Sequence, residues 1–160
     1  RINTHGGSIR VYIKKDKKVK IDASVKKMLQ EEQIFGIKKY ETYKKFGEKV
    51  YEIRENVLLN IKKLKSQNKK IIGFGAPAKA TTALNFFGIK DEIDFIVEDN
   101  KLKHKKFIPG VKIPIKKKSE ISNKDNVLLV LAWNFYESIK KNNSNLSENF
   151  INIKDLEIKN

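Results

Sequence analysis

The sequence predicts an α/β protein whose C-terminal part is a Rossmann-like, three-layer domain with a mainly parallel sheet. Two observations carry this prediction. From residue 71 onward, continuous apolar runs typical of buried strands alternate with amphipathic helical patterns. The first of these runs leads through a glycine turn into a helix that opens on Pro77. We expect one strand and two helices, the second of them long, to precede this domain.

Alternating apolar and polar side chains over residues 8–14 predict a half-buried strand. Asp22 is the predicted N-cap of a helix that runs to about Phe35. A second helix is expected over about residues 38–67, because apolar side chains recur there at steps of three and four. Its length, roughly 30 residues, suits a connector between two lobes. A coiled-coil dimer is the alternative, although the apolar stripe is short and rich in aromatic side chains.

The remaining elements alternate along the chain. Strands are predicted at residues 71–74, 93–98, 127–132 and 150–153, with a short extended piece at 113–115, and helices at residues 77–87 and 135–142. The Rossmann-like domain therefore covers residues 69–160, and a helical connector over residues 17–68 precedes it.

The amino-acid composition excludes several classes of site and partner. The chain has 160 residues and no cysteine, which excludes disulfides, thiolate zinc sites and cysteine nucleophiles. No apolar run approaches the roughly 20 residues of a membrane span and no signal peptide is apparent, so we expect a cytoplasmic protein without a membrane partner. Nucleic acid is not an expected partner despite the net charge of +16, because lysines are spread over every segment and only three arginines occur. An attraction to small phosphate-bearing molecules remains.

The turn after the first buried strand carries the main functional signal. Gly73, Gly75 and Ala78 fit GxGxxA, a variant of the dinucleotide-binding fingerprint. Glycines permit a sharp turn and a close approach to phosphate, and Pro77 suits the first helical position. The amides that open the helix, together with the Lys79 ammonium, would then face an anion. Close packing of strand against helix, without a ligand, is the alternative.

Two further strand ends reach the same edge of the predicted sheet. Glu98 and Asp99 follow the second strand and lead into a basic loop, and Trp133 and Asn134 follow the third. Ligands of open α/β sheets bind at the carboxyl ends of the strands. The sequence therefore predicts one crevice shared by the three loops.

Five stretches together are similar to one family. They are HGGSIRVY (5–12), GFGAPAKATTALNFFGI (73–89), IDFIVEDN (93–100), KFIPGVKIPI (106–115) and LAWNF (131–135). In this order they resemble the C-terminal domain of the S-adenosylmethionine-dependent sugar C-methyltransferases, which methylate a ring carbon of a nucleotide-linked keto sugar. The sequence departs from the family where Lys103-His104-Lys105 stands in place of a common Lys-Gln-Gly.

The resemblance implies a parent with an N-terminal zinc-binding module, a central methyl-transfer domain and this Rossmann-like domain, which helps to bind the nucleotide-linked sugar. Residues 1–16 would be the last strand of the central domain, an expected partner in the same polypeptide. S-adenosylmethionine and the catalytic cluster would lie upstream. No catalytic residue and no cofactor are therefore expected in this chain, which should not transfer methyl groups alone.

On this reading the substrate-binding residues share one edge of the sheet. They are Gly73, Gly75, Ala76, Pro77, Lys79 and Thr81 as the anion-facing turn, with polar contacts from Glu98, Asn100 and Asn134. A non-catalytic NAD(P)-binding or other nucleotide-binding Rossmann module is the alternative.

Three more residues are weaker candidates. His5 would join a proton relay near the upstream site or bond to the backbone of its own turn, and His104 is expected to be exposed in its lysine-rich loop. Trp133 would stack on a ligand ring or fill the core. Two histidines so far apart predict no metal site.

Overall fold

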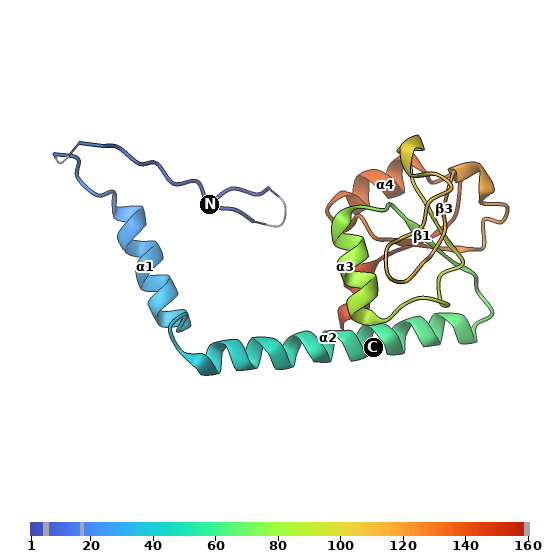
Figure 1. The fold of residues 1–160 in the computed structure, drawn as a ribbon, viewed down its shortest axis with the longest axis horizontal. Helices are drawn as coiled ribbons and strands as arrows, with labels where there is room; N and C mark the ends of the chain where they lie inside the picture. The colour runs from blue at the N-terminus through green and yellow to red at the C-terminus, as the bar shows by residue number, and fades with distance from the viewer. Residues whose placement is uncertain (5–6, 17, 159–160) are drawn as a thin grey trace. The chain divides into compact units, whose positions relative to one another are not determined.

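The computed structural model describes residues 1–4, 7–16 and 18–158 (Figure 1). The chain divides into two compact units, residues 1–51 and 52–160. Among the described helices, none is both long enough and apolar enough to cross a membrane. His5, one of the candidate residues, lies outside the described residues.

The first unit contains the predicted helix α1 (Ala23–Phe35). The Asp22 side chain accepts a hydrogen bond from the Ser24 amide at 2.8 Å, as an N-cap does, and Gly36 ends the helix with a left-handed φ of 81°. Helix α2 (Tyr40–Ser66) begins in this unit and continues into the second. Both predicted helices are confirmed to within two or three residues.

Residues 8–14 differ from their prediction. Ser8 forms only an isolated antiparallel bridge with Ile2, and residues 9–14 adopt no regular secondary structure. The apolar side chains that alternate here are 56–91% exposed; they belong to Ile9, Val11, Tyr12 and Ile13. A strand requires a neighbour to accept its hydrogen bonds, and the described part of the first unit supplies one at Ser8 alone.

The second unit is built on a five-stranded sheet in which every strand runs parallel. The strands are β1 (Ile71–Phe74), β2 (Phe95–Val97), β3 (Ile115–Lys116), β4 (Val127–Val130) and β5 (Asn149–Asn152). Their spatial order is β3-β2-β1-β4-β5. The predicted Rossmann-like α/β fold is therefore confirmed, with β2 and β4 shorter than expected and β3 beginning two residues later.

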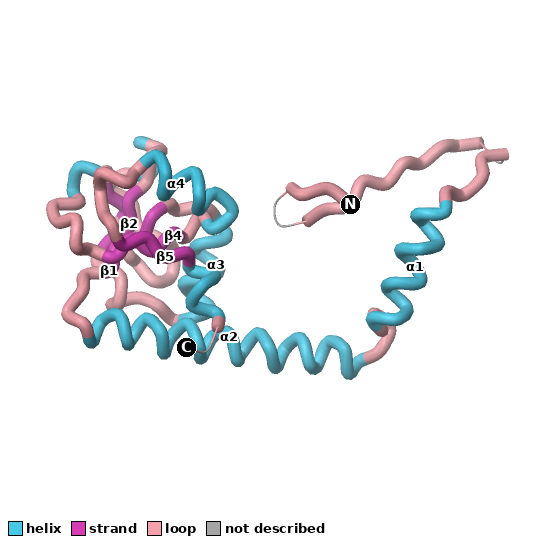
Figure 2. The backbone as a smooth tube through the Cα atoms, turned by 180° about the vertical axis from the view of Figure 1, so that it is seen from behind, coloured by secondary structure: helices cyan, strands magenta, loops and turns pink. Residues whose placement is uncertain are grey.

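Helices cover both faces of this sheet, which gives the three predicted layers. The C-terminal half of α2 and helix α3 (Ala78–Phe87) pack on one face, where Val57 and Leu84 are fully buried. Helix α4 (Tyr136–Asn142) packs on the other face, against Phe74 and Val130. Figure 2 shows α2 and α4 on opposite sides of the strands. The continuous apolar runs of β1 and β4 reflect this burial on both faces.

A short 3₁₀ helix, η4 (Ile153–Glu157), follows β5 and was not predicted. Two amide side chains of α2 hold this C-terminal segment. Asn56 Nδ2 donates to the Glu157 carbonyl at 3.0 Å, and the buried Asn60 Nδ2 donates to the carbonyls of Leu156 and Ile158 at 3.0 and 2.9 Å. The first and last elements of the second unit are thus bonded to each other.

The basic loop after β2 folds into a hairpin that returns through β3. The Lys105 amide donates to the Ile115 carbonyl at 3.0 Å, and the Ile115 amide donates to the Lys106 carbonyl at 2.8 Å. At the tip, Asn85 of α3 donates to the Pro109 carbonyl at 2.9 Å. The hairpin therefore has a fixed position beside the sheet.

Candidate functional site

The strand order places a switch point beside β1. The chain moves outward from β1 to β2 and β3, and then crosses to the other side of β1 to form β4 and β5. Loops after strands on either side of such a point diverge and leave a crevice where ligands of these folds bind. Here the loops after β1 and β4 flank it, with residues 75–77 on one side and residues 131–134 on the other.

The two glycines of the fingerprint have different roles. Gly75 has a φ of +87°, and a Cβ there would lie 2.9 Å from the Ala132 Cβ, so the loops after β1 and β4 are in close contact at this point. Gly73 has no left-handed φ. A Cβ at Gly73 would lie 2.6 Å from Ile96 Cγ1 and 3.0 Å from Leu131 Cδ1. Gly75 is thus needed for the turn, and Gly73 for close packing of β1 against the core.

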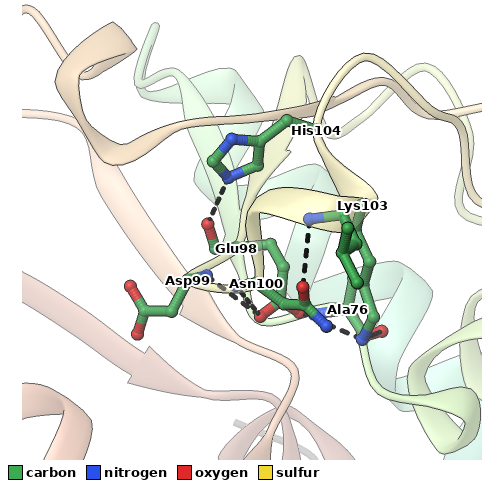
Figure 3. A network of polar contacts seen from close by, with 7 residues as sticks. Ala76, Glu98, Asp99, Asn100, Lys103 and His104 are labelled. Atoms are coloured by element: carbon green, nitrogen blue, oxygen red, sulfur yellow. Dashed lines mark hydrogen bonds and ion pairs between the residues drawn. The ribbon is translucent and has the colours of Figure 1, made fainter.

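The carboxylate of Glu98 lies against the glycine turn (Figure 3). Its Oε2 accepts the Ala76 amide at 2.8 Å and lies 3.4 Å from Lys103 Nζ. Its Oε1 accepts the amides of Asp99 and Asn100 at 2.9 and 3.1 Å. Both oxygens are therefore engaged by the protein itself, and the side chain is only 14% exposed.

The electrostatics of Glu98 follow from these contacts. Burial raises the pKa of Glu98, but hydrogen bonds from the amides of Ala76 and Asn100, together with the Lys103 charge, outweigh it and hold the pKa below its ordinary value. Lys103 Nζ also donates to the Ala76 carbonyl at 2.9 Å. His104 Nε2 lies 2.7 Å from the Glu98 carbonyl; a carbonyl only accepts, so this nitrogen carries the proton.

A second group lies at the switch point. Lys79, in the first turn of α3, places its Nζ 4.1 Å from the centre of the Trp133 ring, in a cation–π contact. Burial and the nearby charge of Lys154 lower the pKa of Lys79. Trp133 is half-buried and packs against the core. It therefore fills part of the core and also presents its ring to a cation.

The start of α3 differs slightly from its prediction. Pro77 is the N-cap, with an extended ψ of 161°, and the first helical residue is Ala78. Pro77 has no side-chain donor or acceptor, and no side chain caps the helix. The amides that open α3 therefore lie beside Lys79 without a side-chain acceptor.

The remaining predicted polar residues lie on α3 and at two short 3₁₀ helices. Thr81 is half-buried one turn along α3, and its carbonyl accepts from Asn85 Nδ2 at 2.8 Å. Asn100 caps η1 (Lys101–Lys103) through its Oδ1, which accepts the Leu102 amide at 3.0 Å. Asn134 is exposed in η3 (Trp133–Phe135).

The predicted residues thus fall into two groups. Ala76, Glu98, Asn100 and His104 belong to the polar network after β2, whereas Lys79 and Trp133 meet at the switch point. Within the described part of the chain, no three His, Asp or Glu side chains gather as metal ligands would.

Two lysines that were not among the predicted site residues complete these groups. Lys103 belongs to the stretch that departs from the family, but the pattern gave no reason to expect it, among several basic residues of the loop, to contact Glu98. Lys154 influences Lys79 from η4, a segment that was not predicted as a helix.

Comparison with known proteins identifies the family. A family model described as the C-methyltransferase C-terminal domain matches residues 3–152, and the chain belongs to this family. Among known proteins, the C-methyltransferase NovU of Streptomyces niveus is 31% identical over 152 residues, which is 92% of this chain and 36% of the relative. The chain therefore spans little more than a third of that relative. The family inferred from the motifs is confirmed.

Proposed function

We propose that this domain binds the nucleotide-linked sugar on which a C-methyltransferase acts, and that S-adenosylmethionine and the catalytic groups are held by another part of the same polypeptide. The observation that carries the proposal is the contact between Lys79 and Trp133 at the switch point. A cation, an aromatic ring and uncapped helix amides meet there. A diphosphate suits the first and last of these, and a nucleobase or sugar ring suits the second.

The Glu98 network favours a nucleotide-linked sugar over NAD(P). In dinucleotide-binding Rossmann domains an acidic residue after the second strand accepts hydrogen bonds from a ribose hydroxyl, and amides of the glycine turn face the pyrophosphate. Here both Glu98 oxygens already accept backbone amides, one of them from Ala76 in the turn. A dinucleotide in that pose would have to displace the Glu98 hydrogen bonds. A diphosphate bound at the start of α3 would leave them intact, because no side chain caps the amides there.

The exposed apolar side chains of residues 9–13 support a partner for the first unit. An apolar segment whose large side chains are each 56–91% exposed gains stability when another surface covers it. We assign that surface to the methyl-transfer domain upstream in the same polypeptide. The isolated chain would then bind the acceptor but transfer no methyl group.

Trp133 is the only tryptophan, so its fluorescence reports on the proposed site. We expect thymidine diphosphate, or a sugar linked to it, to change this emission saturably and to raise the melting temperature. Lys79→Ala should weaken the affinity about tenfold, because a charge-assisted contact to phosphate is lost. Lys140→Ala is the matched control, since Lys140 also lies over an aromatic ring, Tyr136 at 5.9 Å, on another helix.

Two results would contradict the proposal. Equal affinities of the Lys79→Ala and Lys140→Ala variants would remove the switch point as the site. Saturable energy transfer from Trp133 to NADH, without any response to sugar nucleotides, would favour the NAD(P)-binding alternative.

A further inference from the structure

A second region of the domain has the features of an anion site. A cavity of about 370 Å³ lies between the two arms of the hairpin after β2 and the segment that follows β3. Its lining comprises His104, Lys105, Lys106 and Phe107 from the first arm, and Pro114, Ile115, Lys116, Lys117 and Glu120 from the second. The backbone bonds between Lys105, Lys106 and Ile115 hold the arms together, so the cavity is part of the folded hairpin.

The lining is strongly cationic. It contains four lysines and one glutamate. Within the described residues, Lys105, Lys106 and Lys117 form no ion pair with a carboxylate. Their neighbours differ, since Lys103 lies 3.4 Å from Glu98 and Lys118 lies 2.7 Å from Asp99. The carboxylates of this edge are thus paired with the flanking lysines, and the cavity keeps an excess of positive charge.

The general lysine bias of the chain does not account for this excess. The cavity of the first unit, of about 520 Å³, is lined by Arg10 with Asp22 and Glu32, and is otherwise mainly apolar. Positive charges gathered in a concave surface repel one another and raise the local concentration of anions. The lining of the hairpin cavity therefore favours anions electrostatically, whereas that of the first cavity holds more carboxylates than cationic side chains.

An aromatic ring and a strained backbone complete the cavity. Phe107 is 61% exposed at its lining, which leaves one ring available for stacking. Lys105 has a φ of +61°, a conformation that costs energy for a residue with a side chain. The hairpin bonds on either side hold Lys105 in this conformation, and such retained strain is concentrated at functional positions.

We propose that this cavity is a second nucleotide site, in which the lysines hold the phosphates of a nucleoside diphosphate and Phe107 stacks on its base. Its lining includes neither Lys79 nor Trp133, so it is separate from the site of the proposed function and does not depend on it. The ligand is defined by two or more phosphate charges and a planar ring.

Amide chemical shifts of the ¹⁵N-labelled chain can report on the two sites separately. Titration with inorganic pyrophosphate, and then with thymidine diphosphate, should shift the amides of Phe107 and Lys116 saturably. The double variant Lys106→Ala/Lys117→Ala should weaken this response about tenfold or more. The matched control is Lys90→Ala/Lys124→Ala, which removes the same charge from exposed positions outside the cavity.

The outcomes separate the two proposals. The second site would be supported if the ligand still shifts the Phe107 amide in the Lys79→Ala variant but no longer shifts it in Lys106→Ala/Lys117→Ala, the cavity variant. Equal weakening in the cavity variant and the control would overturn it, as would amides of Phe107 and Lys116 that do not move. The base contact is tested by Phe107→Leu, which should reduce affinity for thymidine diphosphate and leave that for pyrophosphate unchanged. Failure of the proposed function would appear elsewhere, as unmoved amides at Ala78 and Lys79.

Discussion

Replacement of Glu98 by glutamine tests the polar network that covers the glycine turn. The substitution keeps the shape of the side chain but turns one accepting oxygen into an NH₂ donor. In the wild type, Oε2 accepts from Ala76 and lies beside Lys103, and Oε1 accepts from Asp99 and Asn100. Whichever way the new amide is oriented, one pair of donors loses its acceptor.

The expected cost follows from these contacts. A hydrogen bond to a charged group contributes about 1.5–3 kcal/mol, and a buried donor left without a partner costs about 1–3 kcal/mol. The contacts at the remaining oxygen become neutral but persist. We therefore expect Glu98→Gln to lower the free energy of unfolding of the second unit by about 2–3 kcal/mol. The low exposure of the side chain, 14%, limits the extent to which water can replace the lost acceptor.

Urea unfolding followed by Trp133 fluorescence measures this cost, with Glu148→Gln as the exposed control. The pKa of Glu98 is lower in the folded protein than in the unfolded chain, so its contribution is present above the unfolded value of about 4.3 and is lost as the pH falls through the folded value. The difference between wild type and Glu98→Gln should therefore shrink below about pH 4. Equal stabilities of the two glutamine variants at pH 7 would refute this account of the turn.

Two further substitutions test backbone positions, Lys105 in the hairpin after β2 and Gly73 in β1. Lys105→Gly should raise the free energy of unfolding by about 0.5–1 kcal/mol, because the gain from relieving a left-handed φ exceeds the cost in chain entropy. Lys106→Gly, the control, relieves no such φ and should lower the free energy of unfolding. The urea midpoints of the two variants test these opposite signs. Gly73→Ala should cost about 1–3 kcal/mol in thermal or urea unfolding, because the new Cβ would lie 2.6 Å from Ile96. Gly47→Ala, on α2 with open space around it, should be neutral or stabilising. A Gly73→Ala variant as stable as Gly47→Ala would show that close packing does not explain the glycine.

Local patterns were sufficient for most of the fold. The apolar runs of β1 and β4 have no polar positions because both faces are covered, and that feature, together with the alternating helices, predicted a parallel sheet. The helix ends were readable because Asp22 and Gly36 make their bonds with near neighbours. Residues 8–14 have the same alternation as a strand, but pairing depends on a neighbour that a local pattern does not specify.

The positions of the loops around the candidate site were predictable, but the bonds between them were not. Parallel strands end at one edge, so the loops holding Glu98 and Trp133 were expected at the same edge as the glycine turn. The partner of the Ala76 amide was not predictable, since the Glu98 side chain reaches it from the end of β2 to the turn after the neighbouring strand β1, and that contact joins residues far apart in the sequence. The cationic cavity likewise arises from the pairing of residues 105–106 with Ile115, which single-sequence periodicity does not reveal.

The bonds from Asn56 and Asn60 to the C-terminal carbonyls bring the entrance and the exit of the second unit together. The second unit is thus closed on itself, because its first helix holds its last segment. The C-terminal segment therefore cannot unfold without breaking its hydrogen bonds to α2. Loss of the tail would strip acceptors from a buried asparagine, so unravelling at one end destabilises the other.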